Sequence, residues 1–292
     1  GPYVALDSFA AVPAAGELLV GDDDTNLQSR GTVSASAPLG FAETVLGAWT
    51  RNLVDETNTF TVSLGDDVFN SCTRDVLLAN GGEFWAYGAP GRWEIGSSAQ
   101  GDSLGSGRYV LSSHLRGLFG TENNTGNHQA GDTFVLLRIA GMLRPDTGVG
   151  GIGQTKSYRA VTKGRSTNSV PSQTFANTGE GLQPLRPVNL RRSANSSNDI
   201  TLSCDRRSRL AMNNSTGALP LGESAESYAW DFYSSGAFAT RVGSLVSTTS
   251  TLTITSAQQF AFGLTPGAAV NVRVHQVSDS VGASSNYLQA TL

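Results

Sequence analysis

The chain has 292 residues and a mass of 30.5 kDa, enough for one large or two ordinary domains, and charged residues make up only 15% of it. Its net charge of -4 supplies no basic field to attract phosphates, so the composition argues against nucleic acid as a partner. No apolar stretch approaches the roughly 20 residues of a membrane-spanning helix. Cys72 and Cys204 lie far apart, so we expect no disulfide between them, and they form no metal-ligand spacing. We expect no bound cofactor and no metal site, apart from the calcium alternative weighed below for 21–26.

Short runs that alternate apolar and polar residues, the period of a half-buried strand, recur along the first half of the chain. Before them, "GFAETVLGAW" (40–49) is the stretch that fits a short helix. In "DVLLANGGEFWAYG" (75–88), Asn80-Gly81 stands between two apolar runs and predicts the tight turn of a β-hairpin, because this pair tolerates positive φ angles. The alternating runs occupy 59–66, 108–113, 133–141 and 156–164.

A change in composition at 164–187, where Pro, Gly, Ser and Asn accumulate, predicts a linker with a domain boundary near 183. We therefore expect a β-rich domain at 1–183 and a second domain at 184–292. The second domain has the strand spacing of a fibronectin type III-like β-sandwich, with Trp230 or Tyr228 filling its centre. The predicted fold class is all-β. The seven predicted strands of the second domain are 186–193, 199–209, 225–234, 237–245, 250–256, 268–277 and 285–291.

Two motifs match ligand-binding patterns without the surrounding context that those patterns need. "GDDDTN" (21–26) offers three carboxylates to a hard cation, but the rest of an EF-hand spacing is absent. An exposed acidic turn is the favoured interpretation of 21–26, and a calcium site is the alternative. "GVGGIG" (148–153) matches a dinucleotide-binding pattern but lacks a strand before it and a helix after it, so it predicts a loop.

"GDSLG" (101–105) matches the pattern in which an esterase presents a nucleophilic serine, here Ser103. Another strand and no helix follows it, and none of the three histidines has an aspartate three positions before it. We therefore predict no catalytic residue and no enzymatic activity. The histidines are His114, His128 and His275.

Trp85, Tyr87 and Trp93 lie close together, and Trp85 and Tyr87 share one face of a predicted strand because they are two residues apart. If these rings were exposed, they could stack on the sugar rings of a glycan or contact a receptor. Large aromatic side chains are usually buried, so a position in the core is the alternative that we weigh more heavily. The three residues are nevertheless the candidate glycan or receptor contact.

The stretch between the strands that contain Tyr109 and Phe134 is polar and holds Arg116, Glu122 and two histidines. Arg116 and Glu122 are close enough in sequence to pair across a tight loop, and we predict that they brace it. This interpretation makes the stretch a structural bend. It requires that the two histidines do not converge with Ser103 and a carboxylate in an open cleft.

The segment 108–137 resembles part of the large tail-tip proteins of gene transfer agents and long-tailed phages, also called host-specificity or baseplate "megatron" proteins. "GRWEIGSSAQ" (91–100) belongs to the same likeness. The residues of 108–137 that carry it are Arg108, Tyr109, Leu111, Ser112, Leu115, Arg116, Gly117, Gly120, Thr121, Glu122, His128, Ala130, Gly131 and Phe134 to Leu137.

The second domain is similar to the C-terminal module of the same proteins in "DRRSRL" (205–210), "LPLGESAESYAWDFY" (219–233) and "VNVRVHQVSDSVGAS" (270–284). Cys204 departs from the pattern, since a tryptophan is expected there. The hub and peptidase-like regions that begin such proteins are absent, and Gly1-Pro2 is typical of a cleaved end. The resemblance therefore implies a C-terminal fragment of a longer protein.

The resemblance implies a structural protein of the virion, located at the distal tail tip and acting at the bacterial cell surface. Its expected partners are other tail-tip and baseplate proteins and a host glycan or outer-membrane receptor, and it is expected to form a homo-oligomer, as a trimer, in the virion. Two alternatives are kept open: a virion-borne or secreted glycan hydrolase, and a purely structural spacer.

Overall fold

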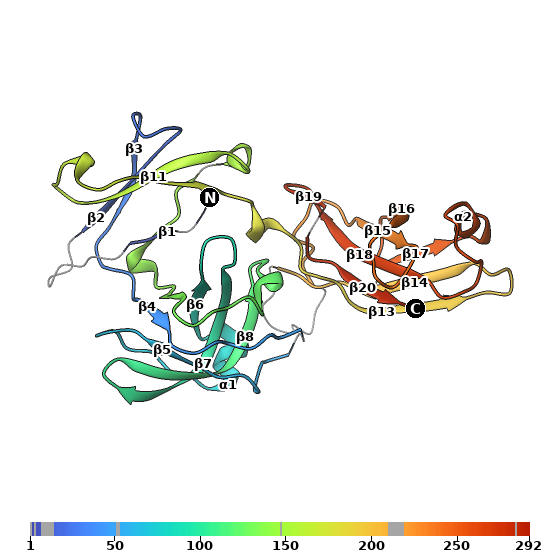
Figure 1. Ribbon diagram of the computed structural model, residues 1–292, viewed down its shortest axis with the longest axis horizontal. Coiled ribbons are helices and arrows are strands. Elements are labelled where there is room, and N and C mark those ends of the chain that lie inside the picture. Colours follow the sequence, from blue (N-terminus) through green and yellow to red (C-terminus); the bar gives the residue numbers. More distant parts are fainter. Residues whose placement is uncertain are drawn as a thin grey trace. The chain divides into compact units, whose positions relative to one another are not determined.

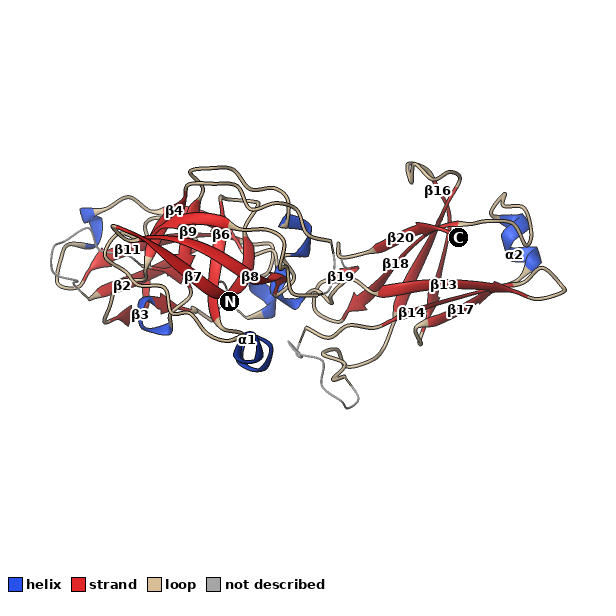
Figure 2. Ribbon diagram, turned by 90° about the horizontal axis from the view of Figure 1, so that it is seen from below, coloured by secondary structure: helices blue, strands red, loops and turns tan. Residues whose placement is uncertain are grey.

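The computed structural model describes residues 2, 4–6, 15–50, 53–146, 148–209, 219–283 and 285–292. Strands dominate this part of the chain, and the helices are short (Figure 2), which confirms the predicted all-β fold class. The chain divides into two compact units, Gly1–Glu180 and Gly181–Leu292. The domain boundary predicted from the sequence lies near 183. Among the described residues, no helix is both long and apolar enough to cross a membrane.

The first unit contains a closed antiparallel barrel with the strand order β4-β5-β8-β7-β6-β9 (Figure 1). Alternate residues of each strand point inward, so that Phe60, Trp85 and Leu111 are buried in one apolar core. The strands are β4 (Leu39–Ala42), β5 (Phe60–Ser63), β6 (Glu83–Gly88), β7 (Glu94–Gly105), β8 (Arg108–Leu118) and β9 (Thr133–Leu136).

Two local predictions in the barrel are wrong. The expected helix at 40–49 is not formed, because Gly40–Ala42 belong to β4 and pair with β5 and β9. The expected hairpin at Asn80-Gly81 is instead the end of helix α1 (Arg74–Asn80), where Gly81 has φ +87° and its N–H donates to the carbonyl of Leu77. A left-handed glycine ends helices as readily as it forms hairpin turns, so the dipeptide alone did not distinguish the two.

A four-stranded antiparallel sheet with the order β12-β11-β2-β3 completes the first unit, together with a two-stranded ribbon of β1 and β10. Leu6, Leu18, Val20 and Val33 form a small core on this sheet. The strands are β1 (Val4–Ala5), β2 (Gly16–Gly21), β3 (Gln28–Val33), β10 (Met142–Leu143), β11 (Thr155–Thr162) and β12 (Gln173–Ala176).

The second unit is a β-sandwich of the predicted fibronectin type III-like kind. A three-stranded sheet has the order β13-β14-β17, and the other sheet has the order β16-β15-β18, with β19 and β20 both paired to β18. Trp230 and Tyr228 are both fully buried between the sheets, as expected. The strands are β13 (Val188–Ala194), β14 (Ile200–Asp205), β15 (Tyr228–Tyr233), β16 (Arg241–Ser247), β17 (Thr251–Ile254), β18 (Asn271–Ser278), β19 (Gly282–Ala283) and β20 (Leu288–Thr291).

Seven of these strands match the seven predicted ones to within a few residues. The alternation missed two elements, the two-residue strand β19 and helix α2 (Ser256–Ala261), which follows β17 directly. Thr255 and Gln258 form a capping box at its start, with the Gln258 side chain accepting from the Thr255 N–H. The buried Gln259 side chain fixes the helix to the sandwich by donating to the carbonyls of Ile254 and Asn198.

Candidate functional site

The predicted aromatic surface is wrong for two of its three residues. Trp85 and Tyr87 are 0% exposed and lie inside the barrel, where the Phe60 ring stacks on Tyr87 at 5.3 Å between centroids. The Trp85 indole donates to the Ser98 hydroxyl at 2.8 Å, so its polar edge is also satisfied internally. Only Trp93 is partly exposed. Trp85 and Tyr87 share the face of the strand that points into the core, which was the alternative weighed more heavily from the sequence. Inward positions of a barrel strand alternate with period two.

Arg116 is buried, and its predicted pairing with Glu122 is wrong. Its Nε and Nη2 donate to the two carboxylate oxygens of Glu94 at 2.6 and 2.9 Å, and its Nη1 donates to Asp55 at 2.9 Å. His128 Nε2 lies 2.6 Å from the second oxygen of Glu94, and the His128 ring stacks on Tyr87. Glu122 instead begins the short 3-10 helix η1 (Glu122–Asn124) and lies against Gly117.

These four side chains form a buried charge cluster, namely Asp55, Glu94, Arg116 and His128. Burial alone would raise the pKa of Glu94, but the bonds from His128 and Arg116 outweigh it and hold this pKa below its usual value. The pKa of Asp55 is also lowered, because bonds from Asn58, Thr57 and Arg116 exceed the effect of burial. Both carboxylates are therefore ionised at neutral pH and both accept hydrogen bonds from the guanidinium, so the cluster is a structural brace of the barrel.

Ser103 does not meet a histidine. It is exposed in the β7–β8 hairpin, where its hydroxyl accepts from the Gly105 N–H. His114 is fully buried, and its ring bonds Ser98 at 2.7 Å and the Asn58 carbonyl at 3.1 Å. Burial lowers the pKa of His114 to about 4, so this histidine is neutral at physiological pH. Ser103 therefore makes no contact with His114 or His128 that could support hydrolysis.

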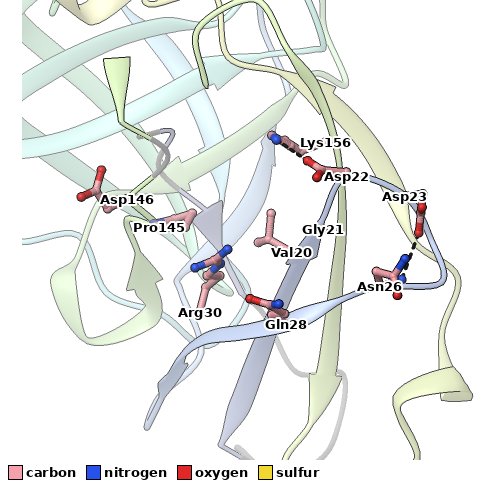
Figure 3. Close-up of a pocket in the computed structure, with 10 residues that line it drawn as sticks. All are labelled: Val20, Gly21, Asp22, Asp23, Asn26, Gln28, Arg30, Pro145, Asp146 and Lys156. Carbon is pink, nitrogen blue, oxygen red and sulfur yellow. Dashed lines mark hydrogen bonds and ion pairs between the residues drawn. The ribbon is translucent and has the colours of Figure 1, made fainter. Parts of the chain in front are cut away.

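The acidic turn at 21–26 borders a polar groove of about 280 Å³ between the β2–β3 hairpin and Pro145–Asp146 (Figure 3). Asp22 pairs with Lys156, Asp24 pairs with Arg159, and Asp23 accepts from the N–H groups of Thr25 and Asn26. Figure 3 shows Asp22, Asp23 and Asp146 spread around the groove. Within the described ranges, no group of three or more His, Cys, Asp or Glu side chains is arranged to hold a metal.

The glycine-rich motif at 148–153 contains one turn of 3-10 helix, η3 (Val149–Gly151), between β10 and β11. The N–H of Gly148 donates to the Asp146 side chain. The next element after the motif is strand β11 (Thr155–Thr162), so the motif does not lead into the helix N-terminus that binds a pyrophosphate.

A cluster of aromatic rings around an arginine lies on the outward face of the second sheet of the sandwich, on the side opposite Trp230 and Val272. The guanidinium carbon of Arg273 is 4.0 Å from the Tyr287 ring centroid and 4.8 Å from that of Tyr233. The Nε and Nη2 groups of Arg273 donate to Gln289 at 3.2 and 2.9 Å. We call this set the arginine–aromatic cluster; it consists of Tyr233, Phe238, Arg273, Tyr287 and Gln289.

The loop between β15 and β16 contributes Phe238 to the cluster at a conformational cost. Phe238 has φ +53°, a left-handed value that costs a bulky residue of the order of 1–3 kcal/mol. Its ring packs edge-on against Tyr233 at 5.5 Å, and its N–H donates to the Ser235 carbonyl, which closes the loop. The strained residue therefore holds an aromatic ring beside Arg273.

This cluster was not predicted from the sequence, because its members come from three separated segments, 233–238, 273 and 287–289. Pairing of β15, β18 and β20 sets Asp231, Arg273 and Gln289 in one row across the sheet. Strand alternation could have placed Tyr233 and Arg273 on the outward face, because their neighbours Phe232 and Val272 are core residues. The order of the strands in the sheet was needed to bring them together.

Residues 37–135 match a family model described as Rcc01698-like, C-terminal. The matched range runs from just before β4 into β9 and therefore covers the barrel. It also includes 91–100 and most of 108–137, the two segments of the barrel on which the resemblance to tail-tip proteins depends. No curated protein matches the chain.

Several solved structures are similar to the chain at low identity. Domains d3–d4 of the rat CD45 extracellular region align with 10% identity and a TM-score of 0.26, covering 48% of this chain and 65% of that one. A two-domain fibronectin type III segment of chicken tenascin has 14% identity and a TM-score of 0.27, covering 86% and 98%. The FN1–FN3 domains of chicken CNTN1 have 10% identity and a TM-score of 0.25, covering 99% and 96%. The sandwich assignment rests on the strand order given above.

Proposed function

We propose that the chain is a non-enzymatic structural component of a tail tip or baseplate that attaches to a glycan on the bacterial cell surface. The observation that supports attachment to a glycan is the arginine–aromatic cluster. Tyr287 is 37% exposed there, beside the planar polar groups of Arg273 and Gln289. Exposed rings beside planar polar groups suit sugars, whose apolar faces stack while their hydroxyls take hydrogen bonds.

The location in a virion, the baseplate partners and the trimeric assembly are proposed from the tail-tip motifs. The match of residues 37–135 to the Rcc01698-like family model covers the same segments of the barrel. The β-architecture suits a structural role, because a sandwich and a barrel are scaffolds that hold binding residues in fixed positions.

The attachment is tested by glycan-array and whole-cell binding of the full chain and of Tyr287→Ala. Loss of the stacking ring is expected to weaken binding roughly three- to tenfold. Phe175→Ala, which removes another exposed aromatic ring from the first unit, is the control and is expected to bind normally. Absence of retention on every glycan and every host cell would refute the attachment.

Assays on the same purified chain distinguish the proposed function from the two alternatives, a glycan hydrolase and a purely structural spacer. A glycan hydrolase would release new reducing ends from host envelope polysaccharide, whereas the proposed protein releases none. A purely structural spacer would bind nothing when purified, and its deletion would shorten or destabilise the particles. Binding without release of reducing ends supports the proposed function.

A further inference from the structure

The outward face of the second sheet of the sandwich carries exposed positive charge on an acidic chain. Arg241 and Arg273 lie on this face, and Arg241 is 60% exposed. The carboxylate in the same rows, Asp231, is only 10% exposed and is paired with Arg241 at 3.2 Å. Burial lowers the pKa of the neighbouring His275, which keeps it neutral at pH 7. The charge that remains available to a ligand on these rows is therefore cationic.

Arg273 is held in one orientation before any ligand arrives. Tyr287 and Tyr233 lie against its guanidinium at 4.0 and 4.8 Å, and Gln289 takes hydrogen bonds from two of its nitrogens. Within the part of the chain that the structure describes, its third nitrogen, Nη1, makes no hydrogen bond. A guanidinium fixed in this way loses little entropy when it binds, and its planar edge matches a carboxylate.

We propose that the arginine–aromatic cluster binds a saccharide that carries carboxylate groups, with Tyr287 stacking on a sugar ring and Arg273 pairing with the carboxylate. This inference rests on the proposed function and names its ligand class. Asp231 already pairs with Arg241, so a neutral sugar would leave the guanidinium of Arg273 without a counter-charge. Charge complementarity therefore favours an acidic sugar.

The test compares two probes that share one backbone: oligogalacturonate and its methyl ester, in which the carboxylates are neutral. Calorimetric titration of the full chain is expected to show binding of the acid that is at least roughly tenfold tighter than binding of the ester. This preference is expected to shrink as salt is added, since charge pairing is screened. Arg273→Gln is expected to remove most of the preference, and Arg241→Gln, at a more exposed position, is expected to reduce it.

Arg191→Gln is the matched control for Arg241→Gln, because the Arg191 side chain is 58% exposed and that of Arg241 is 60% exposed. Arg191 lies on the other sheet and pairs with Asp205. It should keep the full preference for the acid. Circular dichroism checks that each variant is folded. If Arg273→Gln does not fold, Arg241→Gln tests the preference for the acid in its place.

Three outcomes would overturn the inference. Equal binding of the acid and the ester would leave the proposed glycan attachment intact and refute the acidic ligand. Binding of poly-glutamate as tight as that of oligogalacturonate would assign the cluster to a polyanion of another class. Loss of the acid preference in Arg191→Gln would place the site elsewhere. Failure of the glycan array and of cell binding, by contrast, refutes the proposed function itself.

Discussion

Replacing Arg116 with methionine is expected to destabilise the first unit by roughly 3–5 kcal/mol, because it leaves two buried carboxylates without their cation. Glu94 and Asp55 are both 0% exposed and are bonded by Arg116 at 2.6–2.9 Å. Methionine preserves most of the side-chain volume, so the loss of free energy reports the charge and not a cavity. For a unit of this size, the melting temperature is expected to fall by roughly 6–20 °C.

Arg108→Met is the matched control, because Arg108 lies on the same strand and pairs with Glu43 where both side chains are partly exposed, at 46% and 23%. Its loss is expected to cost less than about 1 kcal/mol. Thermal unfolding of the full chain measures both variants. Glu122→Gln tests the pairing predicted from sequence and is also expected to cost less than about 1 kcal/mol. Equal losses from Arg116→Met and Arg108→Met, or a larger loss from Glu122→Gln, would refute the role assigned to the buried cluster.

Three further predictions concern single substitutions in the two units. Because the folded pKa of His114 is about 4, below its unfolded value near 6.5, the unfolded chain binds the extra proton first; stability is expected to fall by up to about 3 kcal/mol as pH drops from about 6.5 to about 4. His114→Gln should flatten that slope in urea titrations at several pH values, and an unchanged slope would assign it to other groups. Trp85→Ala is expected to cost about 3–5 kcal/mol in denaturant unfolding, as a core residue does, and a near-neutral effect would place this ring at the surface. Gly243→Ala forces a methyl group against the Phe262 ring and is expected to cost about 1–3 kcal/mol, whereas Gly150→Ala, which has open space, should be close to neutral in the same assay.

The strands were predictable because their signal is local. In β15 and β18, alternate residues such as Trp230 and Val272 enter the core, and this period of two is visible in any short window of the sequence. The same reasoning failed where one residue type serves two purposes. Gly81 has the positive φ angle that both a hairpin and a helix end require, and only the contacts of α1 with the barrel decide between them.

The alternation also did not show which face of each strand points toward the core. Trp85 and Tyr87 share a face by spacing alone, but whether that face points inward depends on closure of the barrel through β9. The arginine–aromatic cluster depends on sheet order in the same way, since β20 must lie beside β18 for Gln289 to reach Arg273. Such pairs are distant in sequence, and no local pattern encodes them.

The buried cluster gives a physical reason for the segments that resemble tail-tip proteins. Glu94 belongs to 91–100, whereas Arg116 and His128 belong to 108–137, and the antiparallel pairing of β7 with β8 brings the two segments together. Neither segment pairs its buried charged groups by itself, because Glu94 of 91–100 is bonded by Arg116 and His128 of 108–137. The residues that carry the resemblance in these two segments therefore include the ones that hold the barrel together, whereas the proposed glycan attachment involves Arg273 in the second unit.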